Sequence, residues 1–276
     1  GATAADVDAG YLSARGATFS AAGATYEPRA QSYSRAQASS FLWYKELLDG
    51  TSNAEPVLHC YGLHEWAMQY QPAGAPPPPS AKYQQHLPLR VSRATLNAAV
   101  ERRGISCTHV DALRYFSPAA APLNTHGATL VRAQQPLLEQ PACVHAAMDL
   151  LKIALKLHPW LPAELLGDAL EVAIEARTLD VAASPYDLAS FGLAPVRVET
   201  EEGRREYRQR QMELMHRAMP IRSRLLKCYE EFIEACIDVS TVEAALNIPN
   251  SVQFATATPG GPAWRWSEHA AESAVL

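Results

Sequence analysis

Apolar residues recur every three or four positions through the second half of the chain, which is the period of an amphipathic α-helix. Pro141 suits the first turn of a helix that runs to about Leu157, and Pro162 suits the first turn of the next helix. Thr200 is a favourable N-cap for a third helix, which Pro220 should break or kink because proline has no backbone N–H to donate. The pattern therefore predicts a helical second half.

The first half of the chain has a weaker pattern and is predicted in shorter pieces. A first helix is predicted over residues 35–48, ended by Gly50, and another over 93–102, with Ser92 as its N-cap. The segment 105–110 contains β-branched residues and is predicted to be a short strand.

These patterns together predict a mainly α fold, an irregular multi-helix globular domain with at most one or two short strands. We place this helical domain at residues 36–248, with a Pro-rich insertion at 72–88. Residues 1–35 are rich in Ala, Gly and Ser and are predicted to be a loosely ordered lead-in, and residues 249–276 a C-terminal tail. A length of 276 residues suits one domain with such appendages.

The charge of the chain bears on its partners. The net charge is −5, and charged residues make up only 19 % of the sequence. Proteins that bind nucleic acid usually carry a basic face, because neutralising phosphates supplies much of their affinity. The overall charge therefore does not favour DNA as a partner. A local basic face is left open by four arginines of one predicted helix, Arg204, Arg205, Arg208 and Arg210.

The cysteines and the hydropathy bear on location. Five cysteines are an odd number and do not suggest a disulfide framework, so we expect an intracellular, reducing environment with thiols free or bound to a metal. The alanine- and proline-rich composition is typical of a GC-rich genome and leaves an organelle, chloroplast or mitochondrion, open as the location. No apolar run approaches the ~20 residues that a membrane-spanning helix needs, so we expect no membrane span.

Three short segments each place a cysteine close to a histidine. Thiolate and imidazole are the usual ligands of zinc and related metals, which makes zinc the candidate cofactor. Residues two apart point about 200° apart in a helix, so Cys143 and His145 cannot both reach one ion if both are helical. The alternative is that the cysteines are small core residues and the histidines hydrogen-bond within the core. The candidate metal ligands are Cys60, His64, Cys107, His109 and His145.

Carboxylates and aromatic residues lie in the same segments. A carboxylate packed beside aromatic rings loses hydration and its pKa rises, which suits it to acid–base chemistry near neutral pH. The alternative for each carboxylate is a structural role, such as a helix cap or a surface charge network. The candidate catalytic residues are Glu65, Asp111, Asp149 and Asp187, with His64, His109 and His145 to orient or protonate; the candidate substrate-binding residues are Trp66, Tyr70, Tyr115, Phe116 and Tyr186.

Four long strings carry a resemblance to a known family. They are HCYGLHEWAMQY (59–70), ISCTHVDALRYFSPAAAPLN (105–124), EQPACVHAAMDLLKIALKLHPWLPAELLGDALEVA (139–173) and RTLDVAASPYDLASFGLAPVRVETEEGRREY (177–207). Over about residues 41–235 the chain resembles bacterial proteins commonly labelled 3-methyladenine DNA glycosylase. The resemblance implies hydrolysis of the N-glycosidic bond of an alkylated purine, with DNA as the partner. An enzyme of that kind flips the base into an aromatic pocket and uses a carboxylate at the reacting bond.

The sequence leaves three functional hypotheses open. The first is the DNA glycosylase that the resemblance implies. The second is a non-catalytic helical subunit of a larger assembly, with protein partners and a structural metal site or a polar core; the low charge content and the Ala-rich and Pro-rich extensions motivate it. The third is a metal-dependent enzyme of another substrate class.

Overall fold

The computed structural model describes residues 17–20, 23–26, 33–76, 87–102 and 104–237. Most of the predicted lead-in over 1–35, most of the Pro-rich insertion and the predicted tail over 249–276 lie outside these residues. The elements are β1 (Ala17–Ser20), β2 (Gly23–Tyr26), α2 (Arg35–Asn53), α3 (Leu63–Gln69), α4 (Arg93–Glu101), α5 (Val110–Leu113), η3 (Ala121–Leu123), η4 (Arg132–Gln134), α6 (Gln135–Leu138), α7 (Val144–Leu157), α8 (Ala163–Ala182), η5 (Ala189–Phe191) and α9 (Glu201–Cys236).

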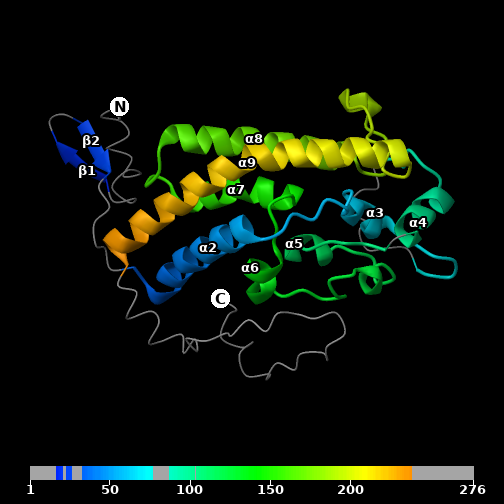
Figure 1. The fold of residues 1–276 in the computed structure, drawn as a ribbon, viewed down its shortest axis with the longest axis horizontal. Helices are drawn as coiled ribbons and strands as arrows, with labels where there is room; N and C mark the ends of the chain where they lie inside the picture. The colour runs from blue at the N-terminus through cyan, green and yellow to red at the C-terminus, as the bar shows by residue number, and fades with distance from the viewer. Residues whose placement is uncertain (1–16, 21–22, 27–32, 77–86, 103, 238–276) are drawn as a thin grey trace, which may run out of the picture. The chain divides into compact units, whose positions relative to one another are not determined.

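The mainly α fold that the sequence predicts is confirmed. The strands β1 and β2 pair antiparallel, with Ala17 opposite Tyr26 and Ser20 opposite Gly23. Helix α7 packs along α8, and α9 lies against α2, α7 and α8 (Figure 1). The apolar faces of these four helices form most of the core, with Leu47, Leu150, Leu165 and Leu225 almost completely buried.

Helix α2 is longer than the sequence predicts. Ser34 caps it through a capping box with Gln37, but the helix continues through Gly50 to Asn53, so the prediction that Gly50 ends it is wrong. The glycine is used for packing instead. A Cβ atom at position 50 would lie 2.5 Å from the carbonyl oxygen of Pro136, so the absence of a side chain lets the backbone of α6 approach α2 closely.

The long helix α9 begins as predicted. The Thr200 hydroxyl accepts a hydrogen bond from Gly203 N at 3.1 Å, which is the capping contact that the sequence predicts. Pro220 does not break the helix, which is continuous from Glu201 to Cys236. Figure 1 shows α9 changing direction part-way along, in agreement with a kink at proline. Helix α9 contacts both α8 and α2: Arg217 pairs with Glu175 of α8, and Phe232 packs on Phe41 of α2.

The predicted strand over 105–110 is wrong. Ile105 forms a single bridge with Asn124, and helix α5 starts at Val110. The side chain of Asn124 binds both backbone groups of Cys107, accepting from Cys107 N at 2.9 Å and donating to Cys107 O at 3.1 Å. One side chain thus takes the place of a partner strand, and the segment stays extended without a sheet. The described part of the chain contains no helix with the combined length and hydropathy of a membrane-spanning segment.

Candidate metal centre

Two of the three predicted cysteine–histidine segments meet at helix α8. His64 of α3 and His145 of α7 lie beside Asp180 of α8, and the Nε2 atom of His64 is 2.6 Å from Oδ1 of Asp180. The rings of His64 and His145 meet edge to face with centroids 4.4 Å apart. One donor atom from each of the three residues lies within 4.8 Å of the other two. We call these three residues the His–Asp triad.

A tight turn before α3 brings His64 to α8. Tyr61 and Gly62 both have positive φ angles, 50° and 65°, and Gly62 is the N-cap of α3. A Cβ atom at position 62 would lie 3.3 Å from the Cβ atom of Ala183, so a glycine suits both the backbone conformation and the contact with the end of α8. Trp66 Nε1 donates to Ala183 O at 2.8 Å and ties α3 to the same place.

The charges in the His–Asp triad are set by burial and by the pairing of His64 with Asp180. Burial alone would raise the pKa of Asp180, but the charge and hydrogen bond of His64 hold it below its usual range. Burial would lower the pKa of His64, and the charge of Asp180 reverses this and raises it. Burial, together with the charge of His64, lowers the pKa of His145 to about 3. At neutral pH His145 is therefore an uncharged imidazole beside an ionised carboxylate.

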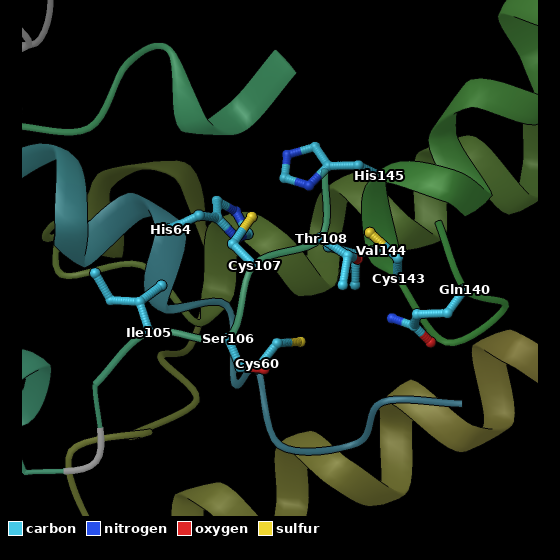
Figure 2. A pocket seen from close by; sticks show the side chains of 10 residues that line it. All are labelled: Cys60, His64, Ile105, Ser106, Cys107, Thr108, Gln140, Cys143, Val144 and His145. Carbon is cyan, nitrogen blue, oxygen red and sulfur yellow. The ribbon is translucent and has the colours of Figure 1, made fainter. Parts of the chain in front are cut away.

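A small cavity of about 10 Å³ lies against the triad. Figure 2 shows that its walls come from the turn before α3, the extended segment 105–108 and the start of α7. A volume of this size holds about one water molecule or one metal ion. The lining residues are Cys60, His64, Ile105, Ser106, Cys107, Thr108, Gln140, Cys143, Val144 and His145.

Three cysteines contribute to the wall of this cavity but not to the triad. Burial raises the pKa of Cys107 to about 12 and raises the pKa of Cys60 and Cys143 as well, so the thiols keep their protons at neutral pH. Cys143 is the extended N-cap residue of α7 and not a helical residue, so the helical geometry expected to separate it from His145 does not apply. Both residues line the cavity.

The third histidine, His109, belongs to a neighbouring group that we call the second cluster. It consists of His109, Glu139 and Asp149, with one donor atom of each within 4.8 Å of the other two. His109 Nε2 is 3.5 Å from Asp149 Oδ2, and the rings of His109 and His145 stack with centroids 4.6 Å apart. The structure therefore places the three predicted histidines side by side, but it divides them between two groups.

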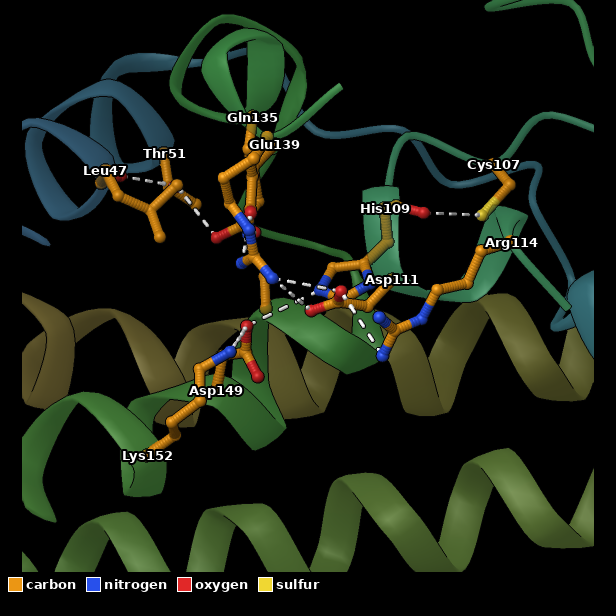
Figure 3. Close-up of polar contacts among 12 residues, drawn as sticks. Leu47, Thr51, Cys107, His109, Asp111, Arg114, Gln135, Glu139, Asp149 and Lys152 are labelled. Atoms are coloured by element: carbon orange, nitrogen blue, oxygen red, sulfur yellow. Dashed lines mark hydrogen bonds and ion pairs between the residues drawn. The ribbon is translucent and has the colours of Figure 1, made fainter. Parts of the chain in front are cut away.

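The second cluster already has protein partners. Glu139 accepts hydrogen bonds from Thr51 at 3.1 Å and from Gln135 at 2.7 Å, and Lys152 Nζ lies 2.7 Å from Asp149 (Figure 3). His109 and Lys152 lower the pKa of Asp149 to about 2 despite its burial. The fully buried Arg222 of α9 lies close enough to Glu139 and Asp149 for their charges to act on its pKa, which burial lowers.

The other predicted carboxylates belong to neither group. Asp111 is paired at the surface with Arg132 at 3.0 Å. Asp187 lies two residues before η5 and accepts a hydrogen bond from Ala189 N at 3.1 Å. Glu65 is buried on α3 next to the Tyr186 hydroxyl, whose pKa rises through burial and through the charge of Glu65.

The predicted substrate-binding aromatics have several separate environments. Trp66 is completely buried with the guanidinium of Arg90 over its ring, and Phe116 and Tyr186 are also buried. The Tyr70 hydroxyl donates to Glu101 at 2.9 Å. Tyr115 is 48 % exposed. None of the five lines the cavity beside the His–Asp triad.

Sequence reasoning missed Asp180 and Glu139, which complete the two groups. Asp180 had a detectable signal, because it continues the inward-facing row formed by Ala169, Ala173 and Ala176 on α8. A carboxylate at such a position must find a partner in the core. Glu139 precedes α7 in a loop, where residue spacing does not reveal the direction of a side chain. No family model, curated protein or solved structure matches this chain.

Proposed function

We propose that this protein binds a divalent transition-metal ion through His64, His145 and Asp180. The observation that carries the proposal is the meeting of two imidazoles and one carboxylate, from three different helices, within 4.8 Å. Zn²⁺ binds this combination of nitrogen and oxygen ligands, and Fe²⁺ and Mn²⁺ use related sets. The neutral state of His145 supports the proposal, because a metal needs the free lone pair of an imidazole.

The small cavity supports a role for such an ion in activating water. Three protein ligands leave one position of a tetrahedral ion open, as in catalytic zinc sites. The adjacent cavity has room for about one water molecule. A metal-bound water loses a proton near neutral pH and becomes a strong nucleophile. Hydrolysis is therefore the reaction type that this arrangement supports best.

The predictions drawn from the sequence stand beside this proposal. The cavity beside the His–Asp triad has room for about one water molecule, and a purine needs far more room, so we do not place a purine in it. The metal proposal therefore stands apart from the glycosylase prediction. Cleavage of an alkylated purine from DNA, a role as a helical subunit and an intracellular or organellar location all stay predictions.

Metal analysis of the purified full chain tests the proposal. We expect about one equivalent of Zn²⁺, Fe²⁺ or Mn²⁺ per chain, or uptake of one equivalent after treatment with a chelator. The variant His145→Gln should lose this metal, because the amide is a poor ligand of these ions. The matched control is Asp149→Asn in the second cluster, which should keep it.

The outcome also separates the alternatives. Folded wild-type protein that takes up none of the three metals would overturn the proposal. Release of a purine from methylated DNA by the metal-loaded protein, lost with a chelator, would join the glycosylase prediction to this centre. Release that persists with a chelator would support the glycosylase prediction at another site.

A further inference from the structure

A second cavity, of about 280 Å³, shares the wall residue Ser106 with the small cavity beside the His–Asp triad. Its volume is close to the lower end of the size range of small-molecule sites. Leu63, Ala99 and the aromatic residue Tyr61 supply apolar surface to its wall, and His59 lies on the same wall. The cavity therefore offers room for a small molecule next to a serine hydroxyl and an imidazole.

The hydroxyl of Ser106 contacts two imidazoles. Its oxygen is 3.3 Å from His59 Nε2 and 3.2 Å from His126 Nε2. Such distances are in the range expected for a nucleophile and its base when no substrate is bound. A hydroxyl has only one proton to donate, so Ser106 can donate to one ring only and must accept from the other.

The cavity distinguishes the two rings. His59 lines it together with Ser106, whereas His126 is not among the described residues of its wall. A base that takes the proton of a nucleophile must return it to the leaving group, which lies with the substrate in the cavity. Burial and the charge of His59 lower the pKa of His126, so this ring is neutral at neutral pH and keeps one N–H to donate. Ser106 therefore donates to His59 and accepts from His126.

The backbone on both sides of Ser106 is fixed by one loop. Ile105 exchanges backbone hydrogen bonds with the loop 123–125, at 2.8 and 3.1 Å. Cys107 is bound through both of its backbone groups by the same loop. The loop continues directly to His126, so the same contacts hold the serine and one of its imidazoles in place. A catalytic group needs this kind of pre-organisation.

We propose that Ser106 is the nucleophile of an acyl-transfer site for small carboxylic esters, with His59 as its general base and His126 as a positioning residue. The Ser106 oxygen attacks the carbonyl carbon of the ester while its proton passes to His59 Nε2. The bond from that carbon to the alcohol oxygen breaks, and the alcohol leaves with the proton from His59. Water then attacks the acyl-serine, and its proton passes through His59 to the Ser106 oxygen, which releases the acid.

A fluorophosphonate probe tests the proposal, because it forms a stable bond with an activated serine hydroxyl. The full chain is treated with the probe in the presence of a chelator, and the labelled peptide is identified by mass spectrometry. We expect one label per chain, on Ser106, and none in Ser106→Ala. The matched control is Ser52→Ala, since the Ser52 hydroxyl donates to Leu48 O at 2.7 Å and has no printed role at the cavity; it should be labelled like the wild type.

Variants of the two imidazoles separate their roles. His59→Gln keeps a hydrogen-bonding group but cannot take up a proton, so the rate of labelling should fall about 100-fold or more. His126→Gln keeps an N–H group that can donate to Ser106 and should be labelled at close to the wild-type rate. His126→Leu has no such group and should be labelled several-fold more slowly. Hydrolysis of p-nitrophenyl acetate by these variants should follow the same order.

Ser106→Cys covers the case in which Ser106→Ala does not fold, because a thiol has a similar size and forms no stable product with the probe. No labelling of the wild type, or labelling at another residue, would overturn the proposal. Equal rates for His59→Gln and the wild type would overturn it too, because the serine would then react without its base. Labelling that occurs only without the chelator would also contradict it, since the nucleophile would then depend on a metal ion.

Discussion

The His–Asp triad and the second cluster have similar residues but different surroundings. Each contains imidazole and carboxylate donors within 4.8 Å. In the second cluster, Glu139 is bound by Thr51 and Gln135, and Lys152 and Arg222 supply positive charge next to the carboxylates. In the triad, Asp180 pairs with His64 at 2.6 Å and, among the described lysines and arginines, with the largely exposed Arg177 at 2.9 Å.

This difference shows that a group of metal-ligating residue types is not by itself a metal site. Positive side chains and neutral donors satisfy the carboxylates of the second cluster, so an added cation would have to displace them. The triad offers two imidazoles and keeps one of them, His145, uncharged. We therefore interpret the second cluster as a structural network that supports the triad through the stacked rings of His109 and His145.

The largest effect is expected from Asp180→Ala. This variant leaves His64 buried without its carboxylate partner, and breaking a buried pair from one side costs about 3–5 kcal/mol. Urea denaturation of the metal-free protein measures this loss, and metal analysis should show that the ion is lost as well. Unchanged stability and full metal content in this variant would show that Asp180 does not belong to the proposed metal centre.

A pH effect of intermediate size is expected from His145. The pKa of His145 is about 3 in the folded protein and near 6.5 in an unfolded chain. Between these values only the unfolded chain takes up the proton, so the free energy of unfolding decreases as the pH is lowered. From pH 6.5 to 4.5 this amounts to about 2–3 kcal/mol. With a chelator present, the free energy of unfolding of His145→Gln should decrease by about 2–3 kcal/mol less over this pH range than that of the wild type.

The control for this measurement is His216→Gln, which replaces an exposed histidine of α9. Its stability should follow the wild-type pH dependence. If His145→Gln also follows the wild type, the imidazole of His145 is not held neutral in the folded protein, and one support of the metal proposal is lost.

A smaller effect is expected from Glu139→Ala in the second cluster. The variant leaves the buried amide of Gln135 without its carboxylate acceptor, which should cost about 2 kcal/mol, whereas the Thr51 hydroxyl keeps its hydrogen bond to Leu47 O. The metal content should stay unchanged, in contrast to Asp180→Ala. Glu171→Ala, an exposed position on α8, serves as the control for general effects of losing a glutamate. Loss of the metal from Glu139→Ala would mean that the two groups form a single centre.

The smallest effect is expected from Asp111→Asn. Asp111 pairs with the half-exposed Arg132, and surface ion pairs contribute less than about 1 kcal/mol. Stability and metal content should both stay close to those of the wild type. If purine release from methylated DNA is found, a large loss of that activity in Asp111→Asn would restore this residue as a catalytic candidate.

Local signals in the sequence were sufficient for the helices. Ser92 and Thr200 cap the helices that the sequence predicts, because a capping hydroxyl acts within three residues of its own position. Gly50 misled the prediction, because its role is a contact with α6, far away along the chain. The strand over 105–110 failed for a similar reason, since the binding of Asn124 to Cys107 joins residues 17 positions apart.

The candidate site was predicted in part. The segments around His64, His109 and His145 do lie together, because each carries polar side chains into an otherwise apolar core. The pairing of His64 with Asp180 spans 116 positions and depends on how α3 packs on α8, which no spacing rule contains. The candidate ligands Cys60 and Cys107 line the small cavity, but the donor atoms that lie within 4.8 Å of one another belong to histidine and carboxylate side chains.

The long separation of His64 from Asp180 has a consequence for how an ion would act on the whole chain. In a zinc finger the ligands are close in sequence, and the metal organises a short segment. Here the ligands meet only after α3, α7 and α8 have packed, so an unfolded chain offers no comparable site. By mass action, free metal at about 1,000 times its dissociation constant would then add about 4 kcal/mol to the stability of the entire domain. The metal concentration in the cell would then affect the lifetime of the folded protein as well as its activity.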